Sequence, residues 1–265
     1  MALVSLELVD KHVSRSPLLS KAWKLLQEDV EVQELLRMSN VNAVTRLLYN
    51  DHGPVHARIV TGSALEIFDL LLESGIQPST VMQGVVNTDD QARLIVMLGA
   101  YLHDIGNSLH RINHELAGAF IAKDILDRLL PLILENRDGL LYRIRSEVMH
   151  SIYATAMDVN ALTIEASIVK VADATDMAEG RARIPYMKGK SDIHALSALS
   201  IKKVNITPGS VRPVRIEVFM EDYAGIFQIE NVLMPKIKTS LIGEYIEVVP
   251  RLLRDGSIHL NPIYP

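Results

Sequence analysis

Apolar residues recur every three to four positions through most of the first 200 residues, the period of helices with one buried face. Several of these segments also carry helix-start signals. Ser16-Pro17 places a capping hydroxyl before a proline at the first helical position, and Pro54 opens another segment. Further helices are expected over about 140–154 and 163–178. The pattern therefore predicts a mainly α fold, with an all-helical bundle over residues 1–200.

The pattern changes near residue 201, where apolar and polar residues begin to alternate as they do in half-buried strands. Two such strands, a helix and two further strands are expected, in this order, over about 204–207, 214–219, 223–241, 245–249 and 257–260. This β-β-α-β-β order predicts a small α+β domain over residues 201–265, packed on the helical one.

The composition is that of a globular protein with ample core material, since 48% of the residues are hydrophobic and 22% are charged. Cysteine is absent, so any metal must be held by His and carboxylate. The apolar runs are shorter than the ~20 residues of a membrane span, and the first residues lack a signal-peptide pattern. A net charge of −5 argues against general nucleic-acid binding. We expect a cytoplasmic protein that does not bind membranes.

One stretch, Leu94–Asn107, carries the most informative chemistry. Nine mostly apolar residues run directly into His103-Asp104, and helical spacing puts both side chains on an apolar face. A buried carboxylate is costly unless a cation or several donors meet it, and the next Lys or Arg comes only at Arg111. A metal ion would supply the charge, with the imidazole as co-ligand. The residues leave open the alternative of a His-Asp pair satisfied inside the core by backbone groups.

Four further positions are of the same kind. His56 and His114 each stand at a helix start, and Asp173 lies on a second apolar stripe. His150 shares its face with polar residues, so a surface position suits it equally well. Taken singly, each histidine is more often a core or surface residue than a ligand, and the argument for a metal site rests on the whole set.

In their order along the chain, His56, His103-Asp104 and Asp173 resemble the H…HD…D signature of the HD-domain metal-dependent phosphohydrolases. His114 and His150 resemble the additional ligands of the branch with a two-metal centre, which includes the HD-GYP phosphodiesterases. The local matches are the HDIG sequence at 103–106 and the segments at 113–119 and 166–173. The resemblance covers about residues 51–180 and implies an HD-domain helical bundle.

Two departures from that branch bear on the substrate and the mechanism. The chain lacks a Gly-Tyr-Pro signature and has Asp158-Val159-Asn160 where the branch has an acidic, glycine-rich loop, which argues against a cyclic dinucleotide as substrate. Asn107 replaces the Lys or Glu that relatives often carry, so the proton donor for the leaving group stays unassigned.

The resemblance implies hydrolysis of a phosphate ester by a metal-bound hydroxide, with Asp104 and His103 as catalytic residues. Asp104 would bridge two divalent cations, with His56, His103 and Asp173 on one and His114 and His150 on the other. Ligands of this type suit Fe, Mn, Co, Zn or Ni, and the sequence does not choose among them.

A basic segment follows the Asp173 helix, and its four cations could bind substrate phosphate: Arg181, Arg183, Lys188 and Lys190. A solvated loop is the alternative for such a run. Arg58 and His110 are further candidates for the pocket, and His110 also competes with His114 as a ligand because the two are four residues apart.

These features favour a hydrolase acting on a small phosphorylated metabolite or nucleotide. A second hypothesis is a non-catalytic HD module that metal stabilises and that acts through partner or ligand binding. A nucleic-acid phosphodiesterase is disfavoured by the acidic balance of the chain. One helix on a small sheet cannot cover all the apolar residues of the tail, so we also expect a homodimer with the tail near its interface.

Overall fold

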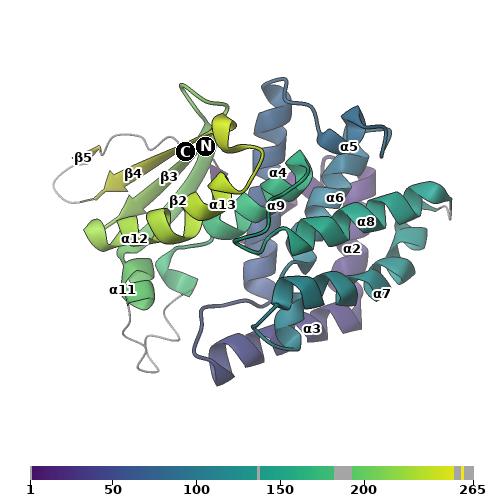
Figure 1. Cartoon of the computed structure of the whole chain (residues 1–265), viewed down its shortest axis with the longest axis horizontal. Coiled ribbons are helices and arrows are strands. Elements are labelled where there is room, and N and C mark those ends of the chain that lie inside the picture. Colours follow the sequence, from purple (N-terminus) through teal and green to yellow (C-terminus); the bar gives the residue numbers. More distant parts are fainter. Residues whose placement is uncertain (1, 136–137, 182–192, 254–257, 260–265) are drawn as a thin grey trace.

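The computed structural model of the chain describes residues 2–135, 138–181, 193–253 and 258–259. Its helical part, in which η marks a π or 3₁₀ turn, comprises α1 (Leu8–Val13), α2 (Pro17–Glu28), α3 (Val30–Asn40), η1 (Val41–Arg46), α4 (Pro54–Glu73), α5 (Ser79–Met82), α6 (Asp89–Leu102), η2 (Ile105–Ser108), α7 (His114–Leu134), α8 (Gly139–Tyr153), α9 (Ile164–Thr175) and α11 (Ile193–Ser200). Figure 1 shows these helices gathered beside a small sheet. The mainly α fold expected from the sequence is confirmed.

The sheet consists of β1 (Ala2–Leu3), β2 (Ile201–Pro208), β3 (Val214–Met220), β4 (Ile246–Leu252) and β5 (Ile258–His259), hydrogen-bonded in that order. Strands β3 and β4 are parallel, and the other neighbouring pairs are antiparallel. The crossover between β3 and β4 is a broken helix made of η3 (Tyr223–Gly225), α12 (Ile226–Gln228), η4 (Ile229–Leu233) and α13 (Met234–Lys238), and η5 (Gly243–Tyr245) leads into β4. The β-β-α-β-β order of the tail is therefore as expected.

The structure differs from the expectation at the first residues of the chain. Instead of starting an all-helical segment, Ala2 and Leu3 pair with Ile206 and Asn205 of β2. An exposed strand edge is an unpaired row of backbone donors and acceptors, and β1 covers part of that edge. The N-terminal strand thus ties the helical part to the tail.

Helix α6 forms the centre of the bundle and ends at the metal-binding candidates. Its residues from Leu94 to Leu102 are all buried, because α2, α4, α8 and α9 surround it. The starts of α6 and α9 are fixed by side-chain caps: the hydroxyls of Thr88 and Thr163 accept from the backbone N–H groups of Gln91 and Ala166. Such caps contribute about 1 kcal/mol each. Because their starts are fixed, the last turns of both helices also lie at fixed positions.

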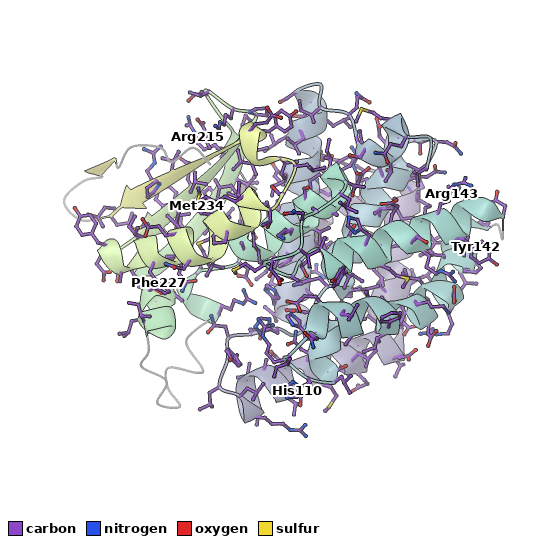
Figure 2. The ribbon with its side chains drawn as sticks, viewed as in Figure 1. His110, Tyr142, Arg143, Arg215, Phe227 and Met234 are labelled. Carbon is purple, nitrogen blue, oxygen red and sulfur yellow. The ribbon has the colours of Figure 1, made fainter. Side chains whose placement is uncertain are left out.

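The tail packs on the bundle through one continuous hydrophobic core that includes residues of both parts. Helix α9 contacts η4 and α13, and α4 contacts β2 and β3. Figure 1 shows the broken helix from α12 to α13 running along the strands, with its α13 end toward α9, and Figure 2 labels Phe227 and Met234 on it. Ile229, Leu233 and Ile237 are fully buried there. The expected homodimer stays a prediction. Within the described residues, no helix has the length and apolar character needed to cross a membrane.

Candidate metal centre

Three side chains from distant parts of the sequence meet at one buried point. His56 lies in the first turn of α4, His103 follows the last residue of α6, and Asp173 lies on α9. The Nε2 atom of His56 is 3.2 Å from Nε2 of His103 and 3.1 Å from Oδ1 of Asp173. One nitrogen or oxygen atom from each residue falls within 4.8 Å of the others. We call these three residues the inner group.

The outer contacts of the two imidazoles fix which ring nitrogens carry protons. Nδ1 of His56 donates to the Asp176 carboxylate at 2.7 Å, and Nδ1 of His103 donates to the Ala100 carbonyl at 2.8 Å. In the neutral ring the two Nε2 atoms then present lone pairs to each other and to carboxylate oxygens. The two Nε2 lone pairs and the facing oxygens of Asp104 and Asp173 repel one another unless a proton or another cation lies among them. Outer hydrogen bonds of this kind are typical of metal-ligating histidines.

The electrostatics of the inner group point the same way. Burial lowers the pKa of His103, but the charges of Asp104 and Asp173 outweigh burial and raise that pKa to about 10. Burial would raise the pKa of Asp173, but Lys236 and His103 hold it well below its usual range. The negative charge of the two carboxylates thus stabilises a proton on the imidazole of His103. A divalent cation at the same place would be stabilised by the same charges. The donor set therefore fits a metal.

Asp104 stands between the inner group and a second pair of histidines, His52 and His114, which we call the outer group. Its Oδ2 atom is 2.6 Å from Nδ1 of His52 and 3.4 Å from Nε2 of His56. Its Oδ1 atom is 3.3 Å from Nε2 of His114. Within 4.8 Å, His52, His56 and Asp104 form a second set of possible ligand atoms. The carboxylate thus contacts histidines of both groups.

The same hydrogen-bond argument applies to His114 in the outer group. Its Nδ1 donates to the Arg111 carbonyl at 3.0 Å, so the lone pair of its Nε2 points toward Asp104 and the Arg111 guanidinium. Burial, with Arg181 and Arg111 nearby, lowers the pKa of His52 to about 3 despite the charge of Asp104. A neutral imidazole is the form that binds metal.

Two local features bring these residues together. Asp51 accepts from the backbone N–H groups of Gly53 and His56. The amide of Asn40 donates to the Asp51 carboxylate and accepts from the His52 N–H. This network shapes the turn before α4. At Gly106, an added Cβ would lie 1.9 Å from the His114 carbonyl oxygen, so only glycine lets η2 approach α7 this closely. Asp104 and His114 therefore meet across that contact.

Three cations border the centre. The guanidinium of Arg181 donates to the carbonyls of Asp51 and Asp176 and reaches Nδ1 of His52 and Nε2 of His56 at 3.2 and 3.1 Å. Arg111 lies 3.0 Å from Nε2 of His114 and donates to Oδ1 of Asn107 at 3.2 Å. Lys236, from α13 of the tail, forms an ion pair with Asp173. Two guanidiniums and one ammonium group therefore contact the residues of the centre.

The structure does not bring every candidate to this point. His150, expected as a second-metal ligand, instead accepts through Nε2 from the Leu162 N–H at 3.1 Å, so the geometry does not support that role. Arg58 donates from Nη2 to both carboxylate oxygens of Asp10 and lies over the Trp23 ring, away from the centre. His110 is exposed, and its Nδ1 accepts from the Ile112 N–H.

Of the basic segment, Arg181 reaches the centre, whereas Arg183, Lys188 and Lys190 lie outside the described residues. Asn107, which we considered only as a departure from the family pattern, donates from Nδ2 to Oδ1 of Asp104 at 2.8 Å. It therefore orients the shared carboxylate and cannot itself give a proton to a leaving group.

Four residues near the centre escaped the sequence analysis: His52, Arg111, Asp176 and Lys236. His52 and Asp176 stand four residues before and three residues after recognised candidates, so their spacing was an available signal. Arg111 stands three residues before His114. Lys236 is 63 residues from Asp173, and the sequence offers no signal that they meet.

Comparisons with known proteins agree with this geometry. The HD domain family matches residues 64–178, which include His103, Asp104 and Asp173. A protein of Methanocaldococcus jannaschii that carries the description "uncharacterized protein MJ1020" is 44% identical over 233 residues, spanning 88% of this chain and 89% of the relative. No solved structure matches. HD domains are generally metal-dependent hydrolases. The chain belongs to the HD-domain family.

Proposed function

We propose that the protein is a metal-dependent phosphohydrolase that cleaves a phosphate ester of a small metabolite or nucleotide. One observation carries the proposal: two imidazole Nε2 atoms with outer partners on Nδ1 face each other at 3.2 Å beside two carboxylates. This arrangement is unfavourable without a cation and suits a divalent transition metal such as Fe, Mn, Co, Zn or Ni.

In this proposal the centre holds two ions. The inner group and Asp104 hold one, and Asp104 with His52 and His114 holds the other. His52 thus takes the place that the sequence analysis gave to His150. Two such cations, when bound, supply Lewis acidity at the phosphate and lower the pKa of a coordinated water. In this chain Asp104 and His103 would bind the ions that supply this chemistry.

The cations of the chain orient the substrate. Arg181 is preorganised, because the Asp51 and Asp176 carbonyls hold its guanidinium against the centre. A guanidinium fixed in this way can donate a charge-assisted hydrogen bond to a phosphate. Arg111 and Lys236 approach from the α7 side and from the tail. Together they would neutralise the charge that develops on the phosphoryl oxygens.

The test is turnover of p-nitrophenyl phosphate and bis(p-nitrophenyl) phosphate by full-length protein freed of metal and reloaded with Mn²⁺ or Co²⁺. We expect metal-dependent release of p-nitrophenol from at least one ester, which Asp104→Ala abolishes. A panel of metabolite phosphates then ranks natural substrates. If the reloaded protein binds metal but hydrolyses none of these esters, the non-catalytic metal-stabilised module becomes the better description.

A further inference from the structure

A pocket adjoins the metal centre on the side of the outer group. It has a volume of ≈ 210 Å³ and is lined by Asn42, Arg46, Leu47, Leu109, His110 and Arg111. One wall is the π turn η1 with the residues after it, and the other is the segment between η2 and α7. Figure 2 labels His110 on this side of the molecule, close to α3.

The pocket is coupled to the metal centre by direct hydrogen bonds. Nδ2 of Asn42 donates to the Asn107 carbonyl at 2.7 Å, and Asn107 in turn donates to the Asp104 carboxylate. Arg111 belongs to both places, because it lines the pocket and contacts His114. The guanidinium of Arg111 therefore lies between the pocket and the metal centre.

The charge in this pocket is unbalanced. The guanidiniums of Arg58 and Arg93 lie against the carboxylates of Asp10 and Asp69. Arg46 donates instead to the amide oxygen of Asn42 at 2.7 Å, and in the described part of the chain neither Arg46 nor Arg111 forms an ion pair. None of the lining residues is acidic. Two such arginines and a histidine around a small pocket are suited to a dianionic phosphate.

The backbone around the pocket is strained on both sides. Leu48 and Asn113 adopt φ angles of 57° and 58°, which are uncommon for residues other than glycine. The π turn of η1 is a further irregularity of a kind often found at functional sites. Leu47 and Leu109 line the pocket although both are well exposed, so a bound ligand would also cover apolar surface.

We propose that this pocket binds a second phosphate of the substrate, so that the preferred substrates are phosphate esters whose non-reacting part carries another phosphate. Arg46 contacts that phosphate and acts as a specificity residue, and Leu47 and Leu109 contact the sugar or base next to it. This inference rests on the proposed function for the identity of the reacting group, but not for the binding of the second phosphate.

The test is calorimetric titration of full-length, metal-free protein with adenosine 3′,5′-bisphosphate and with adenosine 5′-monophosphate. We expect the bisphosphate to bind about tenfold tighter or more, which is the size of one charge-assisted hydrogen bond. Arg46→Met should abolish this preference and Arg46→Lys should restore part of it. Arg37→Met, which removes an exposed arginine paired with Glu34, is the matched control and should keep the preference.

The same variants are then compared as reloaded enzymes by the ratio of kcat/KM for the two nucleotides, which Arg46→Met should lower about tenfold. The proposal for this pocket is wrong if Arg46→Met still prefers the bisphosphate, or if the wild type shows no preference for it. If neither nucleotide nor any test ester is hydrolysed while the binding preference still depends on Arg46, the pocket stands and the proposed hydrolysis fails.

Discussion

The inner and outer groups share Asp104 but differ in how their imidazoles are held. The rings of His56 and His103 are 0% and 1% exposed, and each donates from Nδ1 to a fixed acceptor. His52 and His114 are 8% and 6% exposed, and of these two only His114 donates to a backbone carbonyl, that of Arg111. Arg181 contacts His52 and also His56, and Arg111 contacts His114.

This difference indicates two tasks. An ion in the inner group is surrounded by ligands whose geometry is set before it binds, so it should be retained tightly. The outer group contacts the guanidiniums of Arg181 and Arg111, so in the proposed two-metal centre its ion would lie beside the substrate phosphate. We therefore expect the inner ion to serve structure and chemistry together, and the outer ion to be the more exchangeable of the two.

The largest effect is expected from removal of the shared carboxylate. Changing an outer partner of a metal ligand typically costs about 10–100-fold in metal affinity, and Asp104 is a direct contact of both groups. Asp104→Ala should therefore lose most of both ions and more than 100-fold in kcat/KM. Elemental analysis of the purified protein measures this, with circular dichroism as the check on folding. Two ions retained at wild-type affinity would contradict a shared ligand.

A smaller and more selective effect should separate the groups. His52→Ala should lose about one ion per chain and most of the turnover, while the inner ion remains. His150→Ala is the matched control, since its imidazole accepts a backbone hydrogen bond instead of facing the cluster. Metal titration followed by calorimetry counts the sites in each variant. A result in which His150→Ala loses an ion and His52→Ala does not would restore the ligand set first inferred from the resemblance.

The contrast between His52 and His150 shows how much of the site can be predicted from the sequence. Apolar spacing predicted that His103 and Asp173 face the interior, and a helix start marked His56. In the structure His56 and His103 are buried and Asp173 is half-buried. His52 stands in a turn shaped by Asn40 and Asp51, and no periodic pattern describes a turn. Only the resemblance gave His150 a ligand role, and in the structure its Nε2 accepts from the Leu162 N–H.

The fold could be predicted to a similar depth. Helices with strong periodicity and caps, such as α2 and α6, and the alternating strands β2 and β3 were identified from local sequence alone. The strand β1 was not, since two residues carry no period and depend on the edge of β2. The helix expected over 223–241 contains the π turn η4, where packing against α9 adds to local propensity.

The contact between Lys236 and Asp173 gives a prediction about the tail. It brings a cation from α13 to the inner group, so the tail is expected to tune the centre and not merely cover it. Lys236→Met should lower kcat/KM about tenfold, the value of one charge-assisted hydrogen bond, and keep both ions. Lys238→Met, on the exposed side of the same helix, is the control. Equal effects of the two changes would mean that the tail acts only through general charge.

The smallest effect concerns stability, in a region remote from catalysis. His12 on α1 is buried, and its two ring nitrogens contact the carboxylates of Asp69 and Glu66 on α4, each at 2.9 Å. Burial lowers the pKa of His12, but these two hydrogen bonds and charges outweigh it and raise the pKa above its usual 6.5. A proton bound more tightly in the folded state stabilises that state.

This contribution is complete below the pKa of the unfolded chain and disappears as the pH rises through the raised pKa of the folded one. We therefore expect the free energy of unfolding to fall between about pH 6 and the alkaline side of that pKa. His12→Gln should flatten the dependence, whereas His110→Gln, which alters an exposed imidazole, should leave it unchanged. Urea unfolding at a series of pH values measures the slope. A wild-type profile as flat as that of His12→Gln would show that the ring is not protonated between the two carboxylates, and α1 would then be held to α4 by neutral hydrogen bonds and the neighbouring ion pairs.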